Sequence, residues 1–176
     1  MRIDDALAGW EFAPGRLLQA GLSHGTIEVD AAIEERPMLR FRNQDDNRLR
    51  HAGIYALYDW CWGSDQQWLH STSQQNSVFS HDHGFFLPPS GWRWDAGQLR
   101  AKVDEPHPLR QEVDGLLRED LWRFADELDK VDRAVLLPIL LRVPSAWPAT
   151  DTDLETLGWF LERRAVAVAS RLRDLL

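Results

Sequence analysis

The stretch that decides the fold spans residues 58–84 and reads YDWCWGSDQQWLHSTSQQNSVFSHDHG. Two runs within it, residues 67–71 and 76–82, look like short strands separated by polar turn formers, so the sequence predicts a β-hairpin. Asp65 precedes the hairpin after a Gly-Ser turn, and Asp82 lies at its end in an Asp-His-Gly sequence. Two such carboxylates suit phosphoryl transfer, because one can orient a hydroxyl nucleophile and the other can hold a magnesium ion that bridges nucleotide phosphates.

Upstream of the hairpin, apolar residues recur at helical spacing from residue 49 to residue 60, behind the start signal Asp45-Asp46. The pattern predicts a helix that leads directly into the Gly-Ser-Asp turn. Asp59, near the end of this helix, is expected to accept hydrogen bonds and brace the loop. Residues 1–44 are weakly patterned, with a helical turn expected between Asp4 and Trp10.

Downstream of the hairpin, residues 85–92 are too rich in Pro and Gly for a helix or a central strand, so a loop with aromatic anchors is expected. Pro138 is expected to kink the last of the next three predicted helices or to restrict it to short turns. The C-terminal helix is predicted from a heavily apolar pattern behind a capping box formed by Thr152 and Glu155. The three helices that precede it are predicted at residues 95–102, 117–129 and 131–142.

Composition limits the class of protein. The chain has 176 residues, 44% of them hydrophobic, which is enough for one sizeable core, so we expect a single domain over residues 1–176. This α+β, mainly helical domain divides into the weakly patterned segment 1–44, a helix, hairpin and loop over 45–94, and a helical layer over 95–176. The net charge of −8 argues against a nucleic-acid partner or an anionic membrane surface.

The remaining composition signals concern the compartment and the available basic groups. No apolar run approaches the roughly 20 residues of a membrane span, and nothing resembles a signal peptide. The lone cysteine, Cys61, cannot form an intrachain disulfide, and a cytoplasmic location is expected. Eighteen arginines stand against two lysines, Lys102 and Lys130, so chemistry that needs an anchoring lysine has only two places to find one.

The segment from about Asn47 to Trp94 resembles the catalytic core of HipA-like kinases. The residues that carry the resemblance are Tyr-Asp-Trp, Gly-Ser-Asp, the hairpin, and Ser-His-Asp-His-Gly-Phe. The resemblance implies a protein-kinase-like C-terminal lobe with a small catalytic β-hairpin. It also implies transfer of a phosphoryl group from ATP, with Mg²⁺, to a Ser/Thr or small-molecule hydroxyl. Asp65 then matches the catalytic aspartate, and Asp82 matches the aspartate that ligates the metal.

The chain also departs from the pattern of that family. Gly63 stands where the loop of the family usually begins with Asn, and the later Asn that helps to hold a second metal appears as His70 or is displaced to Gln66 or Gln67. His70 and Gln67 are therefore the expected secondary ligands of the cofactor. No lysine and no GxGxxG motif precede Asp45, so the grip on the ATP phosphates is expected to come from a partner protein that supplies the N-terminal lobe. A protein can also be the substrate.

Two alternatives remain open from the sequence. In one, the chain is a non-catalytic, pseudokinase-like module that binds or regulates a partner. In the other, His81 and His83 point to one face of a strand and ligate a transition metal together with His70, as in a metal-dependent enzyme. Packing is the expected role of the nine tryptophans, although Trp68 and Trp92 are candidates to stack on a nucleotide base.

Overall fold

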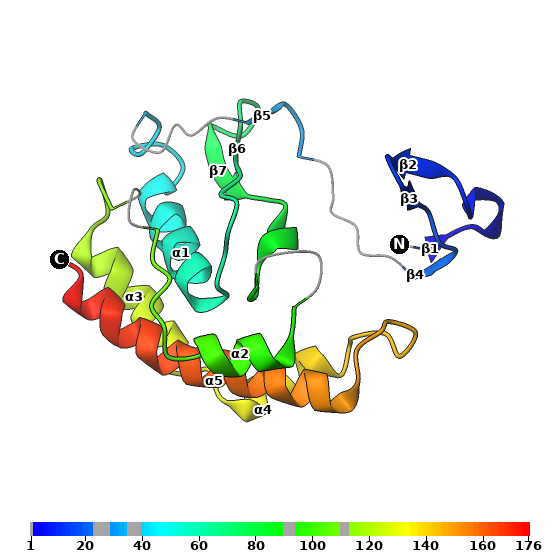
Figure 1. The fold of residues 1–176 in the computed structure, drawn as a ribbon. Coiled ribbons are helices and arrows are strands. Elements are labelled where there is room, and N and C mark those ends of the chain that lie inside the picture. Colours follow the sequence, from blue (N-terminus) through cyan, green and yellow to red (C-terminus); the bar gives the residue numbers. More distant parts are fainter. Residues whose placement is uncertain (1, 23–28, 35–39, 90–93, 110–112) are drawn as a thin grey trace.

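The computed structural model describes residues 2–22, 29–34, 40–89, 94–109 and 113–176, and it is an α+β fold (Figure 1). Five α-helices are present in these ranges: α1 Asn47–Trp60, α2 Ala96–Lys102, α3 Arg118–Leu128, α4 Arg133–Leu140 and α5 Asp151–Asp174. The strands are β1 Arg2–Ile3, β2 Glu11–Ala13, β3 Arg16–Leu17, β4 Gly21–Leu22, β5 Ala32–Glu34, β6 Trp68–Ser71 and β7 Ser77–Ser80. Two 3-10 turns cover Asp5–Leu7 and His83–Phe85.

The predicted hairpin is confirmed, with strands that are shorter than expected. Strands β6 and β7 pair antiparallel, with Trp68 opposite Ser80 and Ser71 opposite Ser77. The structure adds a strand that the sequence did not predict, because β5 pairs with β6 and gives a three-stranded sheet of order β5-β6-β7. The weakly patterned N-terminal segment therefore completes this sheet.

One asparagine ties the start of α1 to the sheet. The Asn47 side chain donates to the backbone carbonyls of Phe41 at 3.0 Å and Asn76 at 2.9 Å, and its carbonyl oxygen accepts from the Val78 amide at 2.9 Å. Since Asn47 is almost fully buried, each of its amide groups needs a partner, and here each has one. Helix α1 is thereby held against β7, and its other end leads to the loop before β6.

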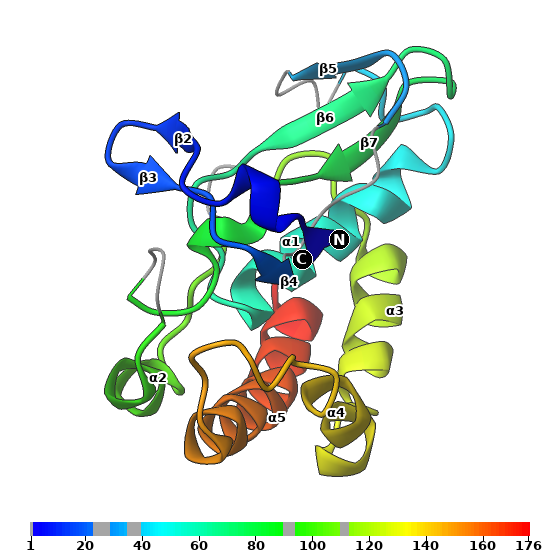
Figure 2. The same cartoon turned by 90° about the vertical axis from the view of Figure 1, so that its right-hand side faces the viewer.

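The helices form one layer with α5 at its centre. Helix α5 packs against α1, α2, α3 and α4, and α1 packs against both α3 and β7 (Figures 1 and 2). The main core lies where α1, α3, α5 and the sheet meet, around Tyr58, Trp68, Leu121 and Val168. A second, smaller core forms beside α2, from Trp62, Leu99, Val103 and Phe160. These two cores lie on either side of the end of α1, where the candidate site begins.

The helical predictions hold in number and approximate position, and one detail, the cap of α5, is wrong. The capping box of α5 is formed by Thr150 and Asp153 rather than by Thr152 and Glu155, so the helix begins two residues earlier. Pro138 lies inside α4, which is a helix of eight residues. The Thr152–Glu155 pair lies within the first turns of α5, where its side chains cannot cap the helix start.

The N-terminal segment also builds two small sheets. Strand β1 pairs with β4 and β2 pairs with β3, each pair antiparallel. The Trp147 indole in the loop between α4 and α5 donates to the Leu22 carbonyl at 3.1 Å, which ties β4 to the helical layer. Of the helices in the described ranges, none combines the length and the apolar character needed to cross a membrane.

Candidate functional site

The loops before and after the β6–β7 hairpin lie side by side. The Ser64 amide donates to the Phe85 carbonyl at 3.1 Å, and the Leu87 amide donates to the Cys61 carbonyl at 3.0 Å. Asp65 directly follows Ser64, and Asp82 lies three residues before Phe85. The two loops that carry the predicted catalytic and metal-binding carboxylates are therefore joined by their backbones at the open end of the hairpin.

Both carboxylates are exposed and sit on unusual backbone. Asp65 has φ of 55° and Asp82 has φ of 48°, which is the left-handed region that non-glycine residues rarely adopt. Neither aspartate forms an ion pair within the described part of the chain. Such backbone costs about 1–3 kcal/mol per residue and is concentrated at binding sites. The two side chains are thus presented to solvent by strained loops rather than used to hold the fold.

Gln67 and Tyr58 connect the two loops. The Gln67 side chain donates to the Asp65 carboxylate at 3.1 Å, and its backbone carbonyl accepts from the His81 amide at 3.1 Å. The Tyr58 hydroxyl accepts from the Gln67 amide at 3.4 Å. Burial raises the pKa of Tyr58, and the charges of Asp65 and Asp82 raise it further, although the bond from the Gln67 amide acts in the opposite direction. Both carboxylates therefore lie within electrostatic reach of one hydroxyl, which the sequence did not single out.

Gly63 allows the first loop to pass over the aromatic core. A Cβ atom at Gly63 would lie 2.4 Å from Cδ1 of Tyr58 and 2.8 Å from Cε1 of Phe86. The rings of Tyr58 and Phe86 themselves meet edge to face, with centroids 4.8 Å apart. A glycine is therefore required at position 63 by close packing.

His70, expected as a secondary ligand, lies elsewhere. It is 3% exposed, and its ring packs on Phe41 with centroids 4.9 Å apart. The strand pairing of the hairpin ends with Trp68 opposite Ser80, and one further bond joins the His81 amide to the Gln67 carbonyl, next to Asp82. His70 pairs with Val78, four residues before Asp82, which corresponds to about 13 Å along an extended strand. The structure does not bring His70 to the two carboxylates.

Gln66 directly follows Asp65 and lies nearer than His70 to the two loops. Its side-chain oxygen is buried and has no hydrogen-bond partner among the described residues. A buried amide oxygen without a partner is uncommon and calls for a ligand, a water molecule or an ion. Its place between Asp65 and Gln67, whose carbonyl binds the His81 amide, makes this oxygen a candidate donor for the same site.

The three histidines of the metal-enzyme alternative do not form a cluster. Strand β7 ends at Ser80, so the two-residue alternation that would point His81 and His83 to one face does not extend that far. His83 instead pairs with the Ser80 hydroxyl, with 3.0 Å between Nε2 and Oγ. Searching the described residues finds no group of three or more His, Cys, Asp or Glu side chains that could hold a metal ion.

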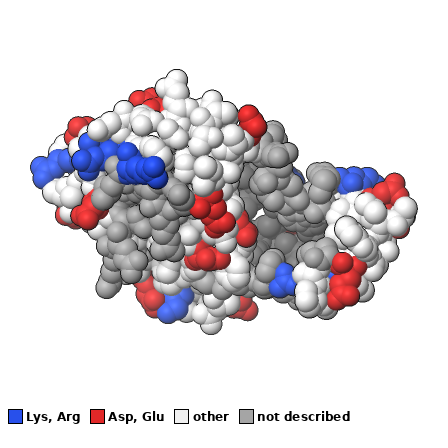
Figure 3. Space-filling view, turned by 90° about the horizontal axis from the view of Figure 1, so that it is seen from above, with Lys and Arg blue, Asp and Glu red and all other residues white. Residues whose placement is uncertain are grey.

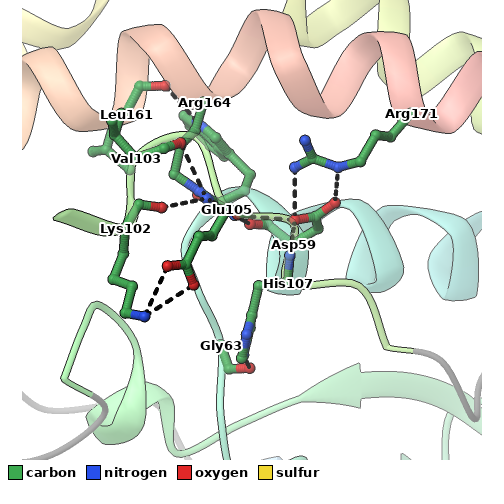
Figure 4. A network of polar contacts seen from close by, with 10 residues as sticks. Asp59, Gly63, Lys102, Val103, Glu105, His107, Leu161, Arg164 and Arg171 are labelled. Atoms are coloured by element: carbon green, nitrogen blue, oxygen red, sulfur yellow. Dashed lines mark hydrogen bonds and ion pairs between the residues drawn. The ribbon is translucent and has the colours of Figure 1, made fainter. Parts of the chain in front are cut away.

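Behind the first loop lies a buried polar network around Asp59 (Figure 4). Arg171 donates to both carboxylate oxygens of Asp59, at 2.8 and 2.9 Å, and Arg164 donates to the carboxylate at 3.0 Å and also to the Asp59 backbone carbonyl. Arg164 also donates to the backbone carbonyls of Trp60, Lys102, Val103 and Glu105. The expected bracing role of Asp59 is confirmed, with two arginines that the sequence did not link to it.

Arg164 fastens the ends of two helices. Its guanidinium is fully buried and binds carbonyls at the ends of α1 and α2, where helix carbonyls lack intrahelical partners. Burial lowers the pKa of Arg164 to about 10, with the Asp59 charge acting in the opposite direction. The guanidinium therefore stays charged at neutral pH, and Asp59 compensates that charge.

His107 extends the network to the loop itself. The His107 amide donates to the Asp59 carboxylate at 2.9 Å, and His107 Nε2 lies 2.9 Å from the Gly63 carbonyl oxygen (Figure 4). The His107 ring stacks on Trp62 with centroids 4.3 Å apart. Since Gly63 lies two residues before Asp65, this contact holds the backbone of the candidate catalytic loop against the network.

The remaining predictions for the site concern tryptophans and Cys61. Trp68 is 1% exposed and packs against Tyr58 and His51, so it belongs to the core and cannot stack on a nucleotide. Trp92 lies outside the described residues. Burial raises the pKa of the Cys61 thiol to about 12, as expected for an apolar, unreactive cysteine.

Comparison of the chain with protein-family models, with curated proteins and with solved structures finds no match. The function of the site can therefore be inferred only from its geometry. That geometry is a hairpin whose flanking loops are hydrogen-bonded to each other, with one exposed carboxylate on each loop.

Proposed function

We propose that this chain is a HipA-like kinase-fold protein that transfers the γ-phosphoryl group of ATP, with Mg²⁺, to a Ser/Thr or small-molecule hydroxyl. The observation that carries the proposal is the backbone bond between Ser64 and Phe85, which joins the Asp65 and Asp82 loops across the mouth of the hairpin. Phosphoryl transfer needs little covalent chemistry from a protein, and positioned charges supply most of the catalysis.

Asp65 is the positioning group for the acceptor in this proposal. Its carboxylate accepts a hydrogen bond from the acceptor hydroxyl and takes its proton as the new oxygen–phosphorus bond forms and ADP leaves. The bond from Gln67 fixes the orientation of the carboxylate. Asp59 and Arg164 are buried, and half-buried His107 connects them to the loop through its bonds to the Asp59 carboxylate and the Gly63 carbonyl.

Asp82 is the proposed metal ligand. Magnesium prefers hard oxygen donors and is held in nucleotide sites by one or two carboxylates together with phosphates and water. The donors near Asp82 fit this preference, since the Gln66 side-chain oxygen lacks a partner among the described residues and the side-chain oxygen of Gln67 is not the atom engaged with Asp65. Bound Mg²⁺ would neutralise charge on the transferred phosphoryl group. His70 has no part in this site.

The proposal includes a partner protein for the grip on ATP. The only two lysines of the chain lie in its C-terminal part, and each is paired with a glutamate: Lys102 with Glu105 at 2.8 Å and Lys130 with Glu127 at 2.7 Å. Of the described residues before α1, strands β1 to β4 form two sheets of two strands each, and β5 joins the sheet of the hairpin. Neither feature provides the strand lysine and glycine-rich loop with which kinases hold nucleotide phosphates.

Phosphoryl transfer from labelled ATP tests the proposal, using the full chain purified with any protein that copurifies. Asp65→Asn and Asp82→Asn are each expected to lower the rate by about 100-fold or more, because each removes a charge on which the transfer depends. Asp114→Asn is the matched control, since Asp114 is an exposed aspartate remote from both loops in sequence. Unchanged transfer in either site variant, or equal losses in all three, contradicts the proposal.

A second candidate is a pseudokinase-like module that binds a partner without catalysis, and the engagement of both lysines favours it. Thermal unfolding with and without Mg²⁺ and ATP separates the two candidates. A ligand at 100 times its Kd stabilises the folded state by about 2.7 kcal/mol, which gives a measurable shift in Tm. A shift that Asp82→Asn abolishes supports the kinase, whereas no shift with the partner present supports the non-catalytic module.

A further inference from the structure

A second polar site lies at the other end of α1, away from the Asp65 and Asp82 loops. A cavity of about 500 Å³ opens there between the start of α1 and the first turns of α3. Figure 3 shows basic side chains gathered over the part of the molecule around the start of α1. The side chains of this cavity that carry the argument are Arg42, Asn43, Asp46, Arg48, Asp120 and Arg123.

One arginine of the cavity is fixed by the fold. Arg48 donates to the Asn43 side-chain oxygen at 3.0 and 3.3 Å and to the Gly115 carbonyl at 3.2 Å. These bonds link α1 to the turn before α3 and hold the guanidinium at the cavity wall. A guanidinium held in this way has less conformational entropy to lose when it binds a ligand.

The other two arginines are available to a ligand. Arg42 and Arg123 are exposed, and within the described ranges neither forms a hydrogen bond or an ion pair. Three guanidiniums around one cavity are notable in a chain whose net charge is −8. Each guanidinium offers a planar fork of donors that matches the oxygens of a phosphate or carboxylate group.

The N-terminal ends of two helices lie at this cavity and add to the positive electrostatic potential of the arginines. Asp46 and Leu117 are the residues at the N-cap positions of α1 and α3, and neither side chain caps its helix. Uncapped first turns leave backbone N–H groups without intrahelical partners, and the helix dipole is positive there. Both features favour an anion over a cation in the cavity.

We propose that the cavity lined by Arg42, Arg48 and Arg123 binds a phosphate monoester. A dianion with three terminal oxygens can accept from all three guanidiniums, and it carries more charge and more acceptor atoms than a single carboxylate. The site is independent of the proposed catalysis, because the 14 residues of α1 separate it from the catalytic loop by about 20 Å. The same chemistry is offered by a free phosphorylated metabolite and by a phosphorylated side chain of a partner.

Two acidic side chains in the cavity lower its affinity for anions. Asp46 and Asp120 oppose an incoming anion, and burial with the neighbouring Glu119 raises the pKa of Asp120. Replacing Asp120 by Asn removes a like charge while it keeps the shape of the side chain. Asp120→Asn is therefore expected to tighten phosphate binding by about threefold to tenfold.

Isothermal titration of the full chain with phosphoserine tests the proposal. Saturable binding is expected, and the double variant Arg42→Gln/Arg123→Gln is expected to weaken it by at least about tenfold. These two arginines have no bonds to lose in the described structure, so the variant should fold as the parent does. Arg142→Gln is the matched control, because Arg142 is also exposed and lies after α4.

The ligand source is distinguished by two further titrations at constant ionic strength. Equal affinity for inorganic phosphate and for a phosphoserine tripeptide supports a small phosphorylated ligand, and tighter binding of the peptide supports a phosphorylated partner. The proposal is overturned by the absence of saturable binding, by equal competition from chloride, or by binding that the double variant and Arg142→Gln weaken to the same extent.

Discussion

Asp59 and Asp65 are six residues apart in sequence and have opposite surroundings. Asp59 is buried and receives hydrogen bonds from Arg164, Arg171 and the His107 amide. Asp65 is exposed on left-handed backbone, and within the described residues its carboxylate accepts a hydrogen bond from the Gln67 side chain alone. The buried network holds the loop, and the loop presents a carboxylate. An acidic residue near a candidate site therefore indicates a function only when its existing hydrogen-bond and ion-pair partners are known.

The largest effect is expected when the buried network loses its acid. Asp59→Ala leaves the fully buried Arg164 without a compensating charge, which we expect to lower the free energy of unfolding by about 3–5 kcal/mol. Urea denaturation followed by tryptophan fluorescence measures the loss. Arg171→Gln is the milder variant if Asp59→Ala does not fold, and its expected loss is about 1–3 kcal/mol. A loss below 1 kcal/mol for both variants contradicts the bracing role.

The next largest loss of stability is expected where the first loop packs closely on the aromatic core. Gly63→Ala places a Cβ atom 2.4 Å from the Tyr58 ring, which we expect to destabilise the fold by about 1–3 kcal/mol. Gly84→Ala is the matched control on the other loop, because its Cβ atom meets only the end of the Asp82 side chain, at 3.2 Å. Its expected effect is within about 0.5 kcal/mol. Equal effects in the two variants, measured by urea denaturation, would show that the loops are packed alike.

A smaller effect comes from the protonation of His107. Burial lowers the pKa of His107, and the charge of Arg164 lowers it further, while the Gly63 carbonyl and Asp59 act in the opposite direction. The folded state then binds a proton less readily than the unfolded state, so stability is full above the ordinary pKa of 6.5 and falls as the pH drops below it. Denaturation at pH 7.5 and 5.5 measures this fall. His107→Gln is expected to reduce it, and an unaltered pH dependence in that variant excludes His107 as its source.

The smallest effect is expected at the exposed carboxylates. Asp65→Asn and Asp82→Asn should each change the free energy of unfolding by no more than about 0.5 kcal/mol, because neither side chain is buried or ion-paired in the described chain. The same denaturation experiment measures both variants beside Asp59→Ala. A loss above 2 kcal/mol at Asp65 or Asp82 would place that residue with the structural network rather than with the candidate site.

Much of the fold could be predicted from local sequence patterns. Helical periodicity located α1 and α5, and the polar turn after Ser71 located the hairpin, because these signals depend on neighbours in the chain. Strand β5 was missed because three residues with no alternating burial become a strand only when β6 pairs with them. The cap of α5 was placed two residues late because Thr150-Asp153 and Thr152-Glu155 are nearly equivalent as patterns.

The candidate site was predicted in part. The sequence pointed to the loops of Asp65 and Asp82, and the structure places these loops in contact. It pointed to His70 as a ligand because spacing along the chain does not reveal the register of a hairpin, which pairs His70 with Val78, away from Asp82. The partners of Asp59 were missed because Arg164 and Arg171 are more than 100 residues away, and nothing local marks such a contact.

The central claim is that Asp65 and Asp82 serve one metal–nucleotide site, and paramagnetic Mn²⁺ tests it most directly. Mn²⁺ takes oxygen donors of the same kind as Mg²⁺ and broadens the NMR signals of nearby amides. With ATP present, we predict selective broadening of the amides of residues 64–67 and 81–84, lost in Asp82→Asn and kept in Asp114→Asn. Broadening of only one loop, or of neither loop at saturating Mn²⁺ and ATP, would contradict a shared site.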